Sequence, residues 1–138
     1  MALYNALQGN IGLGKAIEYF TSHGIPVSIP LNDTQKYDII IDFENQLQKV
    51  SVKTSRCKKS ETSYEVLLKN TGGSSGNNKI RLFDNNSCDY VFIYTADEKL
   101  YLIPSKEINT TNSICVGNKY KEYQVFIKSL ADFDKEVR

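Results

Sequence analysis

Two charged residues on neighbouring predicted strands could carry chemistry. Asp38 stands at the start of one strand and Lys53 lies in the next, with Ser51 two residues before the lysine. A carboxylate can hold a hard divalent cation, which activates a water and neutralises charge building on a phosphate. A nearby lysine can orient or deprotonate that water. Glu18, in a predicted helix, is the natural candidate for a second ligand. This set of residue types fits phosphodiester hydrolysis.

A helix and a hairpin must position these residues. Apolar side chains at helical spacing predict a helix over about residues 10–23, which ends at a Gly-Ile-Pro sequence. Residues 37–43 (YDIIIDF) form a nearly continuous apolar run, typical of a buried strand. Residues 47–53 alternate between apolar and polar side chains and indicate the returning arm of a hairpin. The alternation places Ser51 and Lys53 on the same face.

Several further segments complete the expected fold. The order of elements predicts an α/β (α+β) domain with a mixed sheet and a few helices. We expect a short edge strand at 27–30, strands at 64–68, 88–94 and 100–103, a loop over 70–78, and a last strand near 123–127 followed by a frayed helix.

Length and composition limit the possible classes. The chain has 138 residues, of which 41% are hydrophobic and 24% charged, which predicts one globular domain over residues 1–138. No run approaches the roughly 20 apolar residues of a membrane span, and the first residues do not resemble a secretory signal. Three cysteines and one histidine lack the spacing of a zinc site. We therefore expect a cytoplasmic protein with no membrane partner.

The charge is unevenly distributed. The net charge is +1, yet residues 46–81 contain eight basic and two acidic side chains, a local charge of +6 against −5 elsewhere. Such a segment suits a surface that follows a polyanion backbone, although a solvated lysine-rich loop would have the same composition. The basic candidates are Lys49, Arg56, Lys58, Lys59, Lys69, Lys79 and Arg81.

A second motif points to different chemistry. Residues 9–16 (GNIGLGKA) fit the G-x-x-x-x-G-K pattern of a phosphate-binding loop. Ala16 occupies the position where a magnesium-binding Ser or Thr is needed, and the few preceding residues leave little room for the required strand. A nucleotide-hydrolysing protein is thus disfavoured, and glycines near the start of a helix are the better interpretation.

A family resemblance joins these features. Residues 14–24 (GKAIEYFTSHG), 27–31 (VSIPL), 37–42 (YDIIID) and 50–54 (VSVKT) resemble the PD-(D/E)XK nuclease superfamily, and most of all its small group I intron-associated homing endonucleases. The resemblance implies a restriction-endonuclease-like core, with a central mixed sheet flanked by helices. It also implies a Mg²⁺-dependent active site, in which Mn²⁺ can substitute. Relatives of this kind cut double-stranded DNA, often as homodimers or homotetramers. By position, Glu18 and Asp38 would hold the metal and Lys53 would be catalytic.

One departure from the family pattern concerns Ser51. That position is Glu, Asp or, in the intron-associated relatives, Gln. Serine has a shorter reach than these residues and no charge. Three outcomes follow: Ser51 could act through a bridging water, a carboxylate such as Glu65 could take its role, or the active site could be impaired. The last case predicts a DNA-binding protein that keeps the nuclease fold. In either case the glycine-rich loop, including Gly73 and Ser74, would approach DNA closely.

Overall fold

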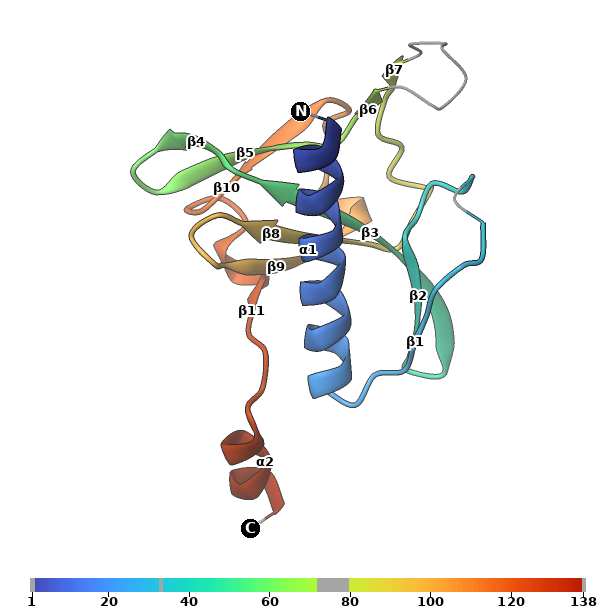
Figure 1. The fold of residues 1–138 in the computed structure, drawn as a ribbon, viewed down its shortest axis with the longest axis vertical. Coiled ribbons are helices and arrows are strands. Elements are labelled where there is room, and N and C mark those ends of the chain that lie inside the picture. Colours follow the sequence, from blue (N-terminus) through green and yellow to red (C-terminus); the bar gives the residue numbers. More distant parts are fainter. Residues whose placement is uncertain (1, 33, 72–79, 138) are drawn as a thin grey trace.

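A six-stranded mixed sheet forms the centre of the fold (Figure 1). The computed structural model describes residues 2–32, 34–71 and 80–137. The strand order is β1-β2-β3-β8-β9-β11, in which β3 and β8 are parallel and every other neighbouring pair is antiparallel. The bounds are β1 Val27–Ser28, β2 Ile39–Phe43, β3 Gln46–Ser55, β8 Tyr90–Thr95, β9 Leu100–Pro104 and β11 Gln124–Val125. This arrangement confirms the expected mixed sheet, with β1 at an edge.

The first helix, α1 (Ala2–Ser22), begins well before the predicted residue 10 and runs through three glycines. Gly12 lies against the sheet: a Cβ at this position would lie 2.1 Å from Cγ2 of Thr54 on β3. The glycine thus allows the helix to approach the sheet closely. α1 is followed by Gly24, whose φ of +71° suits the left-handed end of a helix.

The predicted hairpin is confirmed as β2 and β3. Ile39 pairs with Val50 and Phe43 with Gln46, so a two-residue turn joins the strands. Both turn residues, Glu44 and Asn45, have positive φ (54° and 63°), the geometry that matches the twist of a tight hairpin. The hairpin fixes which side chains of β3 face each side of the sheet.

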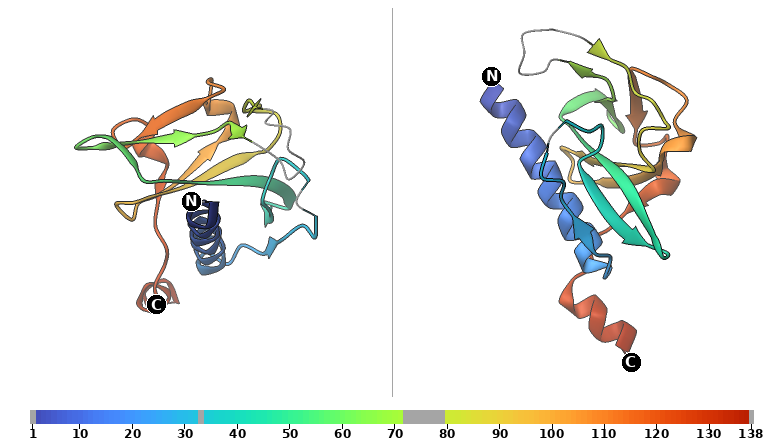
Figure 2. Two further views of the ribbon diagram at one scale, coloured as in Figure 1. Left: turned by 45° about the horizontal axis from the view of Figure 1, so that its top comes forward. Right: turned by 90° about the vertical axis from the view of Figure 1, so that its right-hand side faces the viewer.

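The two faces of the sheet have different partners. α1 covers one face, here called the α1 face, over a core that includes Phe20, Ile39, Val50 and Phe92. The other face, here called the second face, packs against a three-stranded sheet of order β10-β5-β4. Figure 2 (left) shows α1 end-on on one side of the sheet and β5 with β10 on the other. The smaller sheet consists of β4 Cys57–Ser60, β5 Ser63–Leu67 and β10 Ser113–Val116.

Short elements complete the chain. β6 (Asn70–Thr71) pairs with β7 (Ile80–Arg81), so the predicted loop over 70–78 begins with a strand and otherwise lies outside the described residues. Two 3-10 turns occupy Ser105–Glu107 and Lys121–Tyr123, and α2 spans Leu130–Val137. Neither helix in the described ranges is long and apolar enough to cross a membrane.

Candidate active site

Asp38 and Lys53 lie on adjoining strands of the hairpin. Asp38 directly precedes β2, and its Oδ2 accepts a 2.6 Å hydrogen bond from the backbone N–H of Val52. Val50 and Val52 pack on the α1 face, so the alternating residues Ser51 and Lys53 belong to the second face. The carboxylate is thereby fixed to the strand that carries the lysine, one residue before it.

The ammonium of Lys53 is held in a half-buried position. Its Nζ donates a 2.9 Å hydrogen bond to Oδ1 of Asn70 on β6. Burial lowers the pKa of Lys53 below its ordinary value, and the negative charge of Asp38 partly opposes this shift. A lysine with a lowered pKa reaches its neutral form nearer to physiological pH, which suits it to proton transfer.

Ser51 lies in a neutral layer next to Lys53. Its side chain is 5% exposed, as is that of Cys88, whose Sγ lies 3.2 Å from Oγ of Ser105. Burial raises the pKa of the Cys88 thiol, against hydrogen bonds from Ser105, Ser87 and the backbone of Ser51. The position where the family has an acid or an amide is therefore a buried hydroxyl, and its backbone adjoins the Cys88 thiol.

A hollow on the second face contains both Ser51 and Lys53 in its lining. Lys36 and Arg81 also line it and contribute positive charge. Asp84 is the one acid among the described lining residues, and its Oδ1 accepts a 2.9 Å hydrogen bond from the backbone N–H of Asn86. The hollow therefore offers cations to a phosphate beside the lysine.

Three of these residues were not anticipated from the sequence. Lys36 and Asp84 lie in polar loops, and Asn70 adjoins the glycine-rich stretch. Their types carry no recognisable spacing. The one usable signal was the expected position of the 70–78 loop beside the basic segment, which could have placed Asn70 near Lys53.

Glu18 is not brought to the other candidates. It is exposed on α1, the helix that covers the α1 face, whereas Ser51 and Lys53 belong to the second face. The sheet itself separates the two sides. The sequence placed Glu18 on the correct helix but could not show which face of the sheet that helix covers.

Glu65 also has other partners. Its Oε1 lies 3.5 Å from Nζ of Lys59, and its Oε2 accepts a 3.5 Å hydrogen bond from Oγ of Ser113. It does not line the hollow beside Ser51. The structure thus gives no support to Glu65 as the carboxylate that replaces Ser51.

The donor set limits how a metal could bind. Within residues 2–32, 34–71 and 80–137, no three His, Cys, Asp or Glu side chains are grouped closely enough to hold an ion. Mg²⁺ commonly keeps several waters and binds through one or two carboxylates together with substrate phosphates. Asp38 fits that mode with its one carboxylate, and a cage made of protein ligands alone does not fit.

The basic candidates divide into separate groups. Arg81 lines the hollow, and Lys49 on β3 lies 5.3 Å from the ring centroid of Tyr37. Lys58 and Lys59 of β4 form ion pairs with Glu61 and Glu65, and Arg56 donates a hydrogen bond to Gln8. Lys69 is half-buried between β5 and β6, while Gly73, Ser74 and Lys79 lie outside the described residues.

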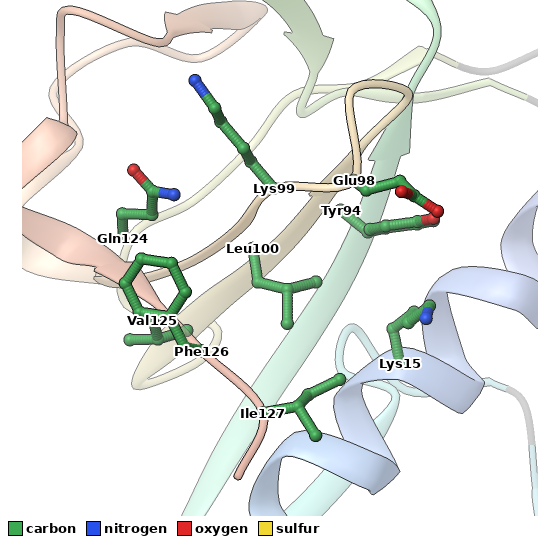
Figure 3. A pocket seen from close by; sticks show the side chains of 9 residues that line it. All are labelled: Lys15, Tyr94, Glu98, Lys99, Leu100, Gln124, Val125, Phe126 and Ile127. Carbon is green, nitrogen blue, oxygen red and sulfur yellow. The ribbon is translucent and has the colours of Figure 1, made fainter. Parts of the chain in front are cut away.

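The G-x-x-x-x-G-K motif lies within α1. Its backbone N–H groups are inside a helix and so cannot form a phosphate-binding loop. Lys15, the lysine of the motif, borders a separate pocket on the α1 face, between α1, β9 and β11 (Figure 3). Its Nζ lies 5.6 Å from the ring centroid of Tyr94. The geometry assigns this lysine a packing role.

A mixed sheet with an acid and a lysine on the two arms of its hairpin defines a class, the nucleases built on a restriction-endonuclease-like core. The chain belongs to the PD-(D/E)XK endonuclease family, whose model matches residues 5–135. It is similar to the solved structure of a bacterial homing endonuclease, I-Ssp6803I, with a TM-score of 0.69 and 26% sequence identity, over 93% of this chain and 86% of that one. No curated protein sequence matches significantly. Family membership and this similarity support a nuclease function.

Proposed function

We propose that the protein is a metal-dependent endonuclease that hydrolyses phosphodiester bonds of double-stranded DNA, at a specific site as the homing endonuclease it resembles suggests. The supporting observation is the pairing of Asp38 with Lys53. The acid is hydrogen-bonded to the backbone next to the lysine, and burial lowers the pKa of that lysine. A hollow lined by two further cations adjoins the lysine.

Each residue of the candidate site has a separate role in the proposed reaction. Asp38 would hold Mg²⁺, or Mn²⁺ in its place, and the cation would activate water and neutralise charge on the phosphate. Lys53 accepts or orients a proton of the attacking water, since its lowered pKa favours the neutral form. Asn70 holds the Lys53 ammonium in position, while Lys36 and Arg81 bind the phosphate backbone. Ser51 can contribute only through a bridging water.

A second candidate function rests on the same site. Ser51 is buried and uncharged, and Glu18 lies on the helix that covers the opposite face of the sheet. A site with one carboxylate binds a metal weakly. The alternative is therefore a catalytically impaired DNA-binding protein that keeps the nuclease fold.

Plasmid cleavage distinguishes the two candidates. Purified protein is incubated with supercoiled plasmid and Mg²⁺ or Mn²⁺, beside Asp38→Ala and Lys53→Ala variants, and DNA binding is measured in parallel. Cleavage by the parent alone supports the endonuclease. Binding without cleavage by the parent favours the impaired protein, and cleavage that survives both substitutions contradicts the site assignment. A random DNA library would then identify the sequence cut.

We further propose that the protein acts as a homodimer or homotetramer. A chain of 138 residues covers a short stretch of DNA, so a long recognition site requires symmetric copies.

A further inference from the structure

An apolar groove runs along the N-terminal half of α1. It lies between this part of the helix and the ends of β3 and β8, and it is lined by Tyr4, Leu7 and Ile11 of α1 together with Thr54 and Tyr94. The three helix residues are 64%, 47% and 56% exposed. Large apolar side chains gathered in one exposed groove are typical of an interaction surface. We refer to this surface as the α1 groove.

Two large apolar side chains of the C-terminal helix α2 are exposed. α2 lies beyond the end of α1 and apart from both sheets in Figures 1 and 2. Leu130 is 85% exposed and Phe133 is 38% exposed. These residues are three apart, so they share one side of the helix. An amphipathic helix of this kind is suited to binding in an apolar groove.

α2 cannot reach the α1 groove of its own chain. The segment before it is attached at the C-terminal end of α1, where the Lys128 backbone N–H donates to Oγ of Ser22 at 3.1 Å and the His23 ring contacts the Phe126 carbonyl at 2.9 Å. Ser22 lies eleven residues after Ile11 in the helix, about 16 Å along its axis. The two residues from Lys128 to the start of α2 span at most about 7 Å. Phe133 lies three residues further along α2, which adds about 4.5 Å, so an α2 helix that occupies the groove must come from another molecule.

The charges of the two surfaces are complementary. Arg56 lines the α1 groove, and Lys58 and Lys59 of the next strand, β4, pair with Glu61 and Glu65, which leaves this region a net charge of +1. The sequence of α2, LADFDKEV, has three acids and one lysine, a net charge of −2. Opposite charges around an apolar contact favour association in one orientation.

We propose that α2 of one copy docks in the α1 groove of a second copy, with Leu130 and Phe133 in the groove and the acids of α2 towards Arg56 and β4. Reciprocal exchange of the two helices gives a closed two-fold dimer. The contact lies on the α1 face, away from Ser51 and Lys53. It gives the proposed oligomer a defined interface and does not depend on nuclease activity.

Sedimentation velocity over a range of protein concentrations tests the contact. We expect the parent to dimerise. Phe133→Ser in α2 or Leu7→Ser in the α1 groove should raise the dissociation constant of the dimer at least tenfold. Leu31→Ser is the matched control, because Leu31 is fully exposed in a loop and belongs to neither surface. An equimolar mixture of the two interface variants is expected to form a heterodimer, since the intact α2 of the Leu7→Ser variant can bind in the intact groove of the Phe133→Ser variant. Circular dichroism checks that each variant is folded.

Two outcomes would overturn the contact, and they differ in what else they affect. A parent that stays monomeric at all concentrations also removes the proposed oligomer. If Phe133→Ser and Leu7→Ser weaken the oligomer no more than Leu31→Ser does, the protein is an oligomer but this interface is rejected. Neither result bears on cleavage, which the plasmid assay measures separately.

Discussion

Oδ2 of Asp38 accepts a 2.6 Å hydrogen bond from the backbone N–H of Val52, the residue immediately before Lys53. The carboxylate thus serves two purposes, since it supplies charge to the site and ties the start of β2 to β3. The two purposes can be separated by substitution, because an asparagine keeps an oxygen acceptor and loses the charge.

Asp38→Asn is expected to abolish cleavage while leaving the fold stable. Loss of the metal-binding charge should reduce the cleavage rate by roughly 100-fold or more. Asp38→Ala removes the acceptor as well and should also destabilise the protein, by about 1 kcal/mol. Thermal unfolding and plasmid cleavage measure the two effects. Equal cleavage by Asp38→Asn and the parent would contradict the role of the carboxylate.

Substitutions of Asn70 should move the pH dependence of cleavage in opposite directions. If Lys53 accepts a proton, activity rises as pH increases through its pKa. Asn70→Asp adds a negative charge that favours the ammonium, which raises the pKa of Lys53 and shifts the rise to higher pH. Asn70→Leu removes the acceptor and keeps the site buried, so the pKa falls and the rise shifts to lower pH. The readout is the cleavage rate against pH.

Opposite shifts would identify Asn70 as a positioning residue for Lys53. A structural defect alone would instead lower the rate of both variants without moving the midpoint. Shifts of the same sign, or no shift in either variant, would reject an electrostatic action of Asn70 on Lys53.

Ser51→Glu should strengthen metal binding at a cost in stability without metal. Position 51 is 5% exposed, so a carboxylate there is desolvated unless a cation pairs with it. We expect a lower melting temperature than the parent in chelator and a larger rise on adding Mn²⁺. Ser51→Ala, which adds no ligand, is the control. A Mn²⁺-induced rise no larger in Ser51→Glu than in Ser51→Ala would place the metal elsewhere.

Arg81 should contribute more to DNA binding than Lys58. Arg81 lines the hollow beside Lys53. Lys58 is instead on the smaller sheet, where its Nζ lies 3.9 Å from Oε2 of Glu61. Each phosphate contact that is lost reduces the slope of log affinity against log salt by about 1. Arg81→Gln is expected to show this reduction and Lys58→Gln to show little. The measurement is DNA affinity by fluorescence anisotropy at several salt concentrations, and equal slopes for both variants would contradict the placement.

The glycines of α1 should respond differently to alanine. Nothing lies within 4 Å of a Cβ at Gly9 or Gly14, so alanine there should stabilise the helix, by up to about 1 kcal/mol each. At Gly12 the new Cβ would collide with Thr54, and overpacking should cost about 1–3 kcal/mol. Thermal unfolding reports both effects. Thr54→Ser, which removes the methyl group, should reduce the cost of Gly12→Ala in the double variant.

The same variants test the phosphate-loop interpretation. If Gly9 and Gly14 belonged to a nucleotide-binding loop, alanine at either position would remove function. We expect Gly9→Ala and Gly14→Ala to keep the cleavage activity of the parent. Loss of cleavage in folded Gly9→Ala and Gly14→Ala proteins would contradict the interpretation of these glycines as ordinary helix residues.

Local patterns predicted the hairpin well. The apolar run of β2 and the alternation of β3 depend on contacts close in sequence, so their pairing and the shared face of Ser51 and Lys53 could be inferred. β4 was missed because all four of its residues are exposed and give no apolar pattern. The start of α1 was placed too late, because the prediction put the glycines near the start of the helix, whereas the helix begins at Ala2 and runs through all three of them.

The site was harder to predict than the strands that carry it. Glu18 was placed correctly on a helix, but the face that the helix covers depends on how the whole sheet is connected. Asn70 contacts Lys53, and Arg81 is brought to the same hollow by the pairing of β6 with β7, which joins segments on either side of the glycine-rich stretch. Such contacts are set by tertiary packing and leave no periodic signal in the sequence.

Alternate residues of the central strand β3 belong to two different surfaces. Ser51 and Lys53 belong to the side proposed for chemistry, while Thr54 contributes to the groove proposed for assembly. A side-chain period of two means that a single-residue insertion within β3 would exchange the two sets. The spacing along this strand is therefore under a joint constraint, and we expect natural variants to tolerate substitutions here far more readily than changes of length.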